Sequence, residues 1–141
     1  LPAAIGAKIG NPDKNVICIS GDGGVQMNIQ EMATAVAQEL PITICILNNG
    51  YLGNVRQWQE LFFNERYSNT IMKNPDFVAI AKAFGIASRA VDKREDLDEA
   101  IAEMLNHDGA YMLVANVETC GMVYPMVPAG GSVTNMILGD K

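Results

Sequence analysis

Two short apolar runs, each followed by a glycine- and amide-rich loop, constrain the fold of this chain more than any other feature. Residues 16–19 lead into the loop 21–24, and residues 42–47 lead into the loop 48–53. The stretch between the first loop and the second run is long enough for one helix. Two parallel strands joined in this way bring their carboxyl ends to the same edge of a sheet, so we expect the two loops to lie side by side.

The rest of the chain alternates in the same manner between helical and strand-like patterns. Asn28 with Glu31 three residues later predicts a capping box, and Asn74 before Pro75 predicts another helix start. The expected helices are residues 1–9, 28–40, 53–63, 74–84 and 92–106, and the expected strands are residues 16–19, 42–47, 86–91 and 111–117. This order predicts an α/β fold with a doubly wound parallel sheet and helices on both faces.

Composition bounds the functions that the chain can have. The 141 residues are 49% hydrophobic with a net charge of −6, which argues for a packed domain and against nucleic acid as a partner. No apolar run reaches the roughly 18 residues of a membrane span, so we expect no membrane partner either. Cys18, Cys45 and Cys120 form no Cys-x-x-Cys pair, and we expect reduced structural thiols and a cytoplasmic location.

The two loops carry the residue types that bind a hard cation and a phosphorylated ligand. Asp22 stands between glycines, so its carboxylate is free to point outward, and the Gly23 and Gly24 N–H groups could receive a diphosphate. Asn49 and a backbone carbonyl just after it would complete the oxygen ligands that Mg²⁺ prefers. Each loop alone is also an ordinary turn sequence. The pair, following neighbouring strands, predicts a site for a cation and a diphosphate.

The pair also resembles a known motif, that of thiamine-diphosphate enzymes, in which Gly-Asp-Gly precedes Asn-Asn by some two dozen residues. Here the matching residues are Gly21-Asp22-Gly23 and Asn48-Asn49. The resemblance implies that Mg²⁺ is bound by Asp22, Asn49 and the main-chain oxygen of Tyr51. It implies a cofactor site formed by Gly21, Asp22, Gly23, Gly24, Asn49, Tyr51, Leu52 and Gly53.

A longer stretch resembles one family in particular, the large catalytic subunit of acetolactate synthase. The similarity rests on residues 48–59, Phe62, residues 66–68, residues 74–77 and the tail around residues 125–131. It implies that residues 1–141 are the C-terminal thiamine-diphosphate domain of a longer chain, whose N-terminal and middle domains are absent here. In that family pyruvate is decarboxylated on the cofactor and the two-carbon unit passes to a second 2-oxoacid, in branched-chain amino-acid biosynthesis.

Two residues of the predicted helix 53–63 are assigned to a substrate channel by this resemblance. Trp58 matches a tryptophan that helps to select the acceptor 2-oxoacid, although an amphipathic helix could also use it as a core aromatic. Asn54 occupies a position where the family usually carries Met. The polar side chain leaves the acceptor preference open.

The resemblance implies that part of the active site lies outside these residues. The family's activating glutamate belongs to the N-terminal domain of a neighbouring subunit, and its FAD is held mainly by the middle domain. We therefore expect no catalytic residue in this chain, an inactive isolated domain, and a homodimer or higher oligomer with a shared active site. A regulatory subunit is a further candidate partner. The single histidine, His107, is expected in a solvated loop.

Two other functions fit the same residues less completely. One is another thiamine-diphosphate enzyme, a 2-oxoacid decarboxylase or oxidase, against which the segment 57–59 and residues 66–68 argue. The other is a non-catalytic phosphate-binding α/β module.

Overall fold

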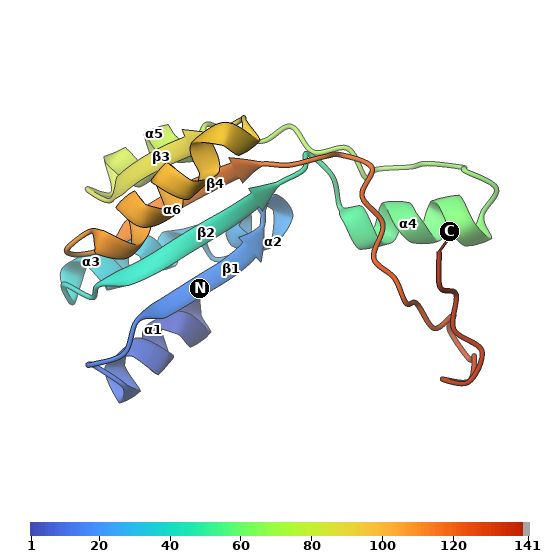
Figure 1. Ribbon diagram of the computed structural model, residues 1–141, viewed down its shortest axis with the longest axis horizontal. Coiled ribbons are helices and arrows are strands. Elements are labelled where there is room, and N and C mark those ends of the chain that lie inside the picture. Colours follow the sequence, from blue (N-terminus) through green and yellow to red (C-terminus); the bar gives the residue numbers. More distant parts are fainter. Residues whose placement is uncertain (140–141) are drawn as a thin grey trace.

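A four-stranded parallel sheet forms the centre of the molecule, in a computed structural model that describes residues 1–139 (Figure 1). The strands are β1 (Val16–Gly21), β2 (Ile42–Asn48), β3 (Ala87–Val91) and β4 (Tyr111–Asn116), and their order in the sheet is β1-β2-β4-β3. The helices are α1 (Pro2–Gly10), α2 (Asp22–Gln26), α3 (Met32–Ala37), α4 (Gly53–Phe62), α5 (Phe77–Ala83) and α6 (Leu97–Asn106), with 3-10 turns at Ile29–Glu31 and Arg94–Asp96.

Helices cover both faces of the sheet, as the alternating sequence pattern predicts. On one face, the buried β2 and β4 side chains contact residues of α2, α3 and α5, and α1 joins them at Ile5; the central members are Ile44, Ile46, Met112, Val25, Met32 and Phe77. On the other face, Tyr111 and Leu113 pack against Ala100 and Met104 of α6. Side chains alternate between the two faces of a strand, so β4 contributes to both cores. The predicted doubly wound α/β fold is confirmed.

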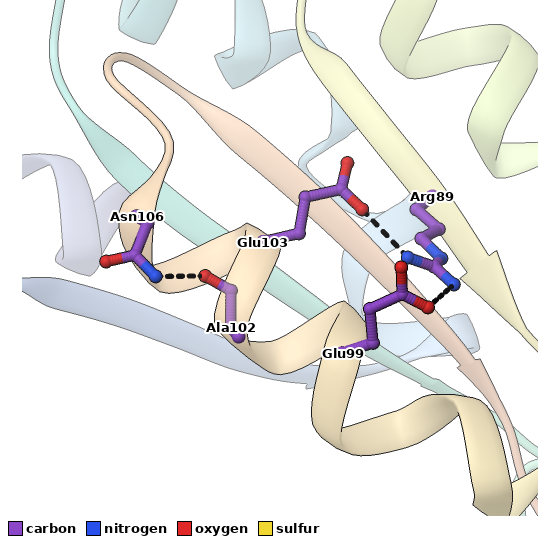
Figure 2. A network of polar contacts seen from close by, with 5 residues as sticks. All are labelled: Arg89, Glu99, Ala102, Glu103 and Asn106. Atoms are coloured by element: carbon purple, nitrogen blue, oxygen red, sulfur yellow. Dashed lines mark hydrogen bonds and ion pairs between the residues drawn. The ribbon is translucent and has the colours of Figure 1, made fainter.

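Helix α6 is fixed to β3 by a forked ion pair. The Arg89 guanidinium donates to Glu103 at 3.0 Å and to Glu99 at 3.1 Å, and the two carboxylates lie one turn apart on the helix (Figure 2). Beneath it, burial and the nearby Glu103 carboxylate raise the pKa of Tyr111 to about 12. Among residues 1–139, no helix covers the rest of this face, over β1 and β2, and Ile19 is 70% exposed there.

The predicted capping box at Asn28 is wrong. A separate short helix, α2, begins already at Asp22, and Asn28 makes no side-chain cap. A 3-10 turn then leads into α3, and the Glu31 carboxylate accepts from the Thr34 hydroxyl at 3.4 Å instead of reaching back. The glycine loop therefore folds into the first turn of a helix, which places Asp22 at its start.

The predicted cap at Asn74 is also wrong. Helix α5 is capped by Asp76, whose carboxylate accepts the Ala79 N–H at 2.9 Å. Asn74 is unavailable for that role because its side chain is bound to residues at the ends of β1 and β2. The sequence spacing predicts a cap at Asn74, but long-range hydrogen bonds to Asp22 and Asn48 occupy its side chain.

The carboxyl edge of the sheet carries the irregular parts of the chain. Helix α4 projects beyond this edge, and the segment after β4 runs out past it (Figure 1). Among residues 1–139, no helix is long and apolar enough to cross a membrane.

Candidate functional site

A cleft of about 600 Å³ opens at the carboxyl ends of β1 and β2. The ends of these strands, the start of α4 and the segment after β4 form its walls. The residues lining it include Ser20, Gly21, Asp22, Gly23, Gly24, Asn49, Tyr51, Leu52, Gly53, Asn54, Gln57, Glu118, Gly121 and Val123. The position is the one at which open parallel sheets bind ligands.

Asp22 is the buried charged group of this cleft, with 1% of its surface exposed. Its Oδ1 accepts the Gly23 N–H at 3.0 Å, and its Oδ2 accepts the Gly50 N–H at 2.9 Å. The side-chain amide of Asn74 donates to Oδ2 as well. A buried carboxylate needs hydrogen-bond partners, and the bond from the Gly50 N–H also joins the two polar loops directly. The Gly23 N–H, expected to face a diphosphate, is directed at the carboxylate.

The second loop is joined to residues 70–72 by a short antiparallel strand pair. Tyr51 and Ile71 form an antiparallel bridge, and the flanking bonds run from Met72 N–H to the Gly50 carbonyl and from Leu52 N–H to the Thr70 carbonyl, both 2.9 Å. Tyr51 lies between these bonds, so its own N–H and carbonyl point away from the pair. Its N–H donates to the Asn49 Oδ1 at 3.1 Å. The Tyr51 carbonyl therefore faces the same side as the Asn49 side chain.

The Tyr51 ring is fixed from the other side by α4. The Arg56 guanidinium lies 5.4 Å from the centre of the Tyr51 ring and 4.8 Å from that of Tyr67. Arg56 also pairs with Glu60 one turn later, at 3.2 Å. These contacts connect the orientation of the Asn49–Tyr51 loop to the helix that forms the next wall of the cleft.

Gly23 and Gly53 stand at crowded points of the cleft. A Cβ at Gly23 would lie 2.9 Å from Leu52 Cδ2 and 3.0 Å from Met72 Sδ. A Cβ at Gly53 would lie 3.1 Å from the Asn49 Nδ2. Both are closer than ordinary carbon contacts. The missing side chain at Gly23 lets the first loop approach Leu52 of the second, and the one at Gly53 leaves room for Asn49 within the second loop.

The segment after β4 forms the last wall, and Gln57 attaches it. The Gln57 side chain is 4% exposed; its Nε2 donates to the Val123 carbonyl at 2.9 Å, and its Oε1 accepts the Val123 N–H at 3.0 Å. One side chain thus makes both backbone hydrogen bonds of a residue in the tail. A glutamine inside an amphipathic helix gives no sequence signal for such a contact.

The site residues expected from the sequence come together in the cleft, with one exception. Every residue expected to bind cofactor or metal lines it, and so does Asn54. Trp58 does not line the cleft; it lies on α4 with 49% of its surface exposed. Sequence reasoning missed Gln57 and Asn74, because both act through partners more than 50 residues away.

The donors of the cleft fit a small hard cation. Asp22 supplies a carboxylate, Asn49 an amide oxygen with one lone pair left, and Tyr51 a carbonyl on the same side as the Asn49 side chain. All are oxygen donors, the type that Mg²⁺ takes. Among the residues that the structure describes, His, Cys, Asp and Glu side chains form no group of three that could hold a metal, so the fit is to an oxygen site completed by amide and carbonyl groups.

The family described as thiamine pyrophosphate enzyme, C-terminal TPP binding domain, matches residues 1–115. The chain is 46% identical over 138 residues to the acetolactate synthase isozyme 2 large subunit of Escherichia coli K12, and 43% identical over 139 residues to the acetolactate synthase large subunit of Parasynechococcus marenigrum. Both alignments cover 97% of this chain, and 25% and 22% of those proteins. The chain thus spans about a quarter of the length of these relatives.

A solved structure shows the same fold. It is the thiamine diphosphate-dependent 4-hydroxybenzoylformate decarboxylase of Rhodococcus jostii RHA1, with a TM-score of 0.78 and 30% sequence identity over 84% of this chain and 22% of that one. The resemblance to acetolactate synthase large subunits is confirmed by sequence, and the thiamine-diphosphate fold by structure. The chain belongs to the thiamine pyrophosphate enzymes, as a C-terminal TPP-binding domain.

Proposed function

We propose that this domain binds the diphosphate of thiamine diphosphate through Mg²⁺, with Asp22, Asn49 and the Tyr51 main-chain carbonyl as the protein ligands. The observation that carries the proposal is the meeting of a buried carboxylate with the Asn49–Tyr51 loop at one edge of the sheet. Mg²⁺ takes few protein oxygens and leaves the remaining positions to water and phosphate. Three protein donors therefore suffice.

The neighbouring residues have supporting roles in this proposal. Gly21 and Gly24 allow the backbone to approach the diphosphate, and Gly23 allows Leu52 to approach from the other loop. When bound, thiamine diphosphate supplies an electron sink for cleavage next to a carbonyl group, while the protein binds and orients it.

The whole enzyme is proposed to be an acetolactate synthase, with pyruvate as donor and pyruvate or 2-oxobutanoate as acceptor, in branched-chain amino-acid biosynthesis. The support is the identity of 40–46% to proteins named acetolactate synthase large subunits. Since the chain covers about a quarter of each, we propose that residues 1–141 act as the C-terminal domain of a larger enzyme. The activating glutamate and an FAD site are assigned to the parts of such an enzyme that lie outside this chain, which supplies no catalytic residue of its own.

Substrate selection is assigned to α4. Asn54 lines the cleft next to the proposed metal loop, so it is the side chain best placed to face an acceptor 2-oxoacid. Trp58 is assigned to the outer part of the same channel, one turn further along the helix.

An oligomer with a shared active site is proposed as the working form. The uncovered face of β1 and β2 presents Ile17, Ile19 and Leu47 to solvent, which is unusual for a surface without a partner. A regulatory subunit remains a candidate partner. The thiols of Cys18, Cys45 and Cys120 are free, which supports a reducing location such as the cytoplasm.

Product analysis of the full-length enzyme with pyruvate tests the proposed reaction. We expect acetolactate as the main product. The similarity to a benzoylformate-type decarboxylase makes simple decarboxylation the second candidate. Acetaldehyde as the main product would support that candidate and contradict the proposed one.

A further inference from the structure

Asn74 makes three side-chain hydrogen bonds beside the cleft, although it lies outside the lining. It stands between α4 and α5, just after the segment that pairs with Gly50 and Leu52. Its Nδ2 donates to Asp22 Oδ2 and, at 2.8 Å, to Asn48 Oδ1. Its Oδ1 accepts from Gln26 Nε2 at 3.0 Å. Both N–H groups and the carbonyl are used, so the amide is fixed in orientation.

These bonds give the two carboxylate oxygens of Asp22 different numbers of hydrogen-bond donors. Oδ2 accepts from both the Gly50 N–H and the Asn74 amide, and a carboxylate oxygen has about two lone-pair directions. Within the described part of the chain, Oδ1 accepts only the Gly23 N–H. Oδ1 therefore keeps a lone pair for a further partner, while Oδ2 is filled.

We propose that Asn74 is a positioning residue of the cation site, and that by filling Oδ2 it makes Asp22 a one-oxygen ligand and so favours Mg²⁺ over Ca²⁺. The inference rests on the proposed metal role of Asp22. Mg²⁺ requires a compact octahedron with single-oxygen ligands, whereas Ca²⁺ accepts six to eight oxygens in a flexible geometry and readily takes both oxygens of one carboxylate. A neutral amide blocks the second oxygen without adding charge.

The Asn74 amide also belongs to a longer row of hydrogen bonds along this edge of the sheet. Asn48, bound by Asn74, donates its Nδ2 to Asn116 Oδ1 at 2.7 Å, and Asn116 donates to Asp92 at 2.6 Å. Residues at the ends of all four strands are joined in one row of hydrogen bonds. The row limits the movement of Asn74, which a selective site requires.

Calorimetric titration of Mg²⁺ and of Ca²⁺ into the full-length protein with thiamine diphosphate present tests the proposal. In Asn74→Ala we expect Mg²⁺ affinity to fall about tenfold or more and Ca²⁺ affinity to change much less, so that the preference for Mg²⁺ shrinks. Asn106→Ala is the control, since Asn106 is an exposed asparagine whose side chain donates to the Ala102 carbonyl within α6 (Figure 2).

Gln26→Ala is the second variant, because it removes the bond to the Asn74 carbonyl and keeps both donors to Asp22 Oδ2. It should lower the preference for Mg²⁺ over Ca²⁺ by a smaller factor. If Asn74→Ala does not fold, Gln26→Ala alone tests the proposal. A merely structural role for Asn74 would lower both affinities equally. An unchanged Mg²⁺/Ca²⁺ ratio in the folded variants would overturn the proposal, and wild-type protein that binds the cofactor without any metal would overturn the metal site itself.

Discussion

Asn74 and Asp22 are 52 residues apart in the sequence, yet the amide of one donates directly to the carboxylate of the other. This contact joins the segment after α4 to the start of α2. Asn74 also donates to Asn48, at the end of β2. The Asp22 carboxylate of the proposed metal site is therefore bound by a third segment of the chain, the one between α4 and α5.

Gly23→Ala should destabilise the domain, because the new methyl group would meet Leu52 and Met72. The atoms met are the ends of flexible side chains, so we expect a loss of about 1 kcal/mol of folding free energy, at the low end of the range for overpacking. Chemical denaturation measures the change. Gly21→Ala is the matched control in the same loop, since a Cβ there meets no atom within 4 Å; equal losses in both variants would contradict the close approach at Gly23.

Gln57→Ala should release the segment after β4 from the cleft. The two lost hydrogen bonds to Val123 each contribute about 1 kcal/mol, so hydrogen exchange at its amide should become about tenfold faster or more. Gln59→Ala serves as the control, because Gln59 on the same helix binds Ser68 instead. The attachment has no role if exchange at Val123 is the same in both variants.

Asn54→Met should shift the acceptor preference of the full-length enzyme towards 2-oxobutanoate. An apolar side chain in the cleft favours the substrate with the extra methylene, by up to about tenfold in relative kcat/KM. Competition between the two acceptors measures the ratio. Asn106→Met, far from the cleft, should leave it unchanged; a wild-type ratio in Asn54→Met would remove Asn54 from the channel.

Arg89→Gln should lower thermal stability at neutral pH but not in acid. The Tyr111 hydroxyl and the Arg89 guanidinium lower the pKa of Glu103 from its usual value of about 4.5. A lowered folded-state pKa means that the ionised carboxylate stabilises the fold above that value, and that this contribution is lost as pH falls through the folded-state pKa.

Melting curves of both proteins should therefore converge towards acid pH. Lys93→Gln is the control, because its pair with Glu95 is largely exposed and should contribute little. A constant difference between Arg89→Gln and wild type across the range would exclude the ion pair as its cause.

Short-range patterns in the sequence predicted the sheet, its helices on both faces and the two polar loops at one edge. Continuous apolar runs mark buried parallel strands, and Asp22 and Asn49 follow such runs directly. These features depend on neighbours in the chain, so sequence reasoning reaches them.

Features set by distant partners were not predictable in this way. Asn74 has the spacing of a helix cap, but three long-range bonds determine its role, and the cap passes to Asp76. Gln57 reads as a polar residue on a helix and becomes the attachment of the tail. The strand order was not predicted from the sequence either, since β4 lies between β2 and β3 in the sheet.

Titration of thiamine diphosphate into the full-length protein, with and without Mg²⁺, tests the central claim most directly. Wild type should bind the cofactor only with Mg²⁺, and Asp22→Ala should bind at least about 100-fold more weakly, since it loses a ligand outright. Asp13→Ala, in an exposed turn, should match wild type. Equal affinity of Asp22→Ala and wild type in the presence of Mg²⁺ would contradict the account.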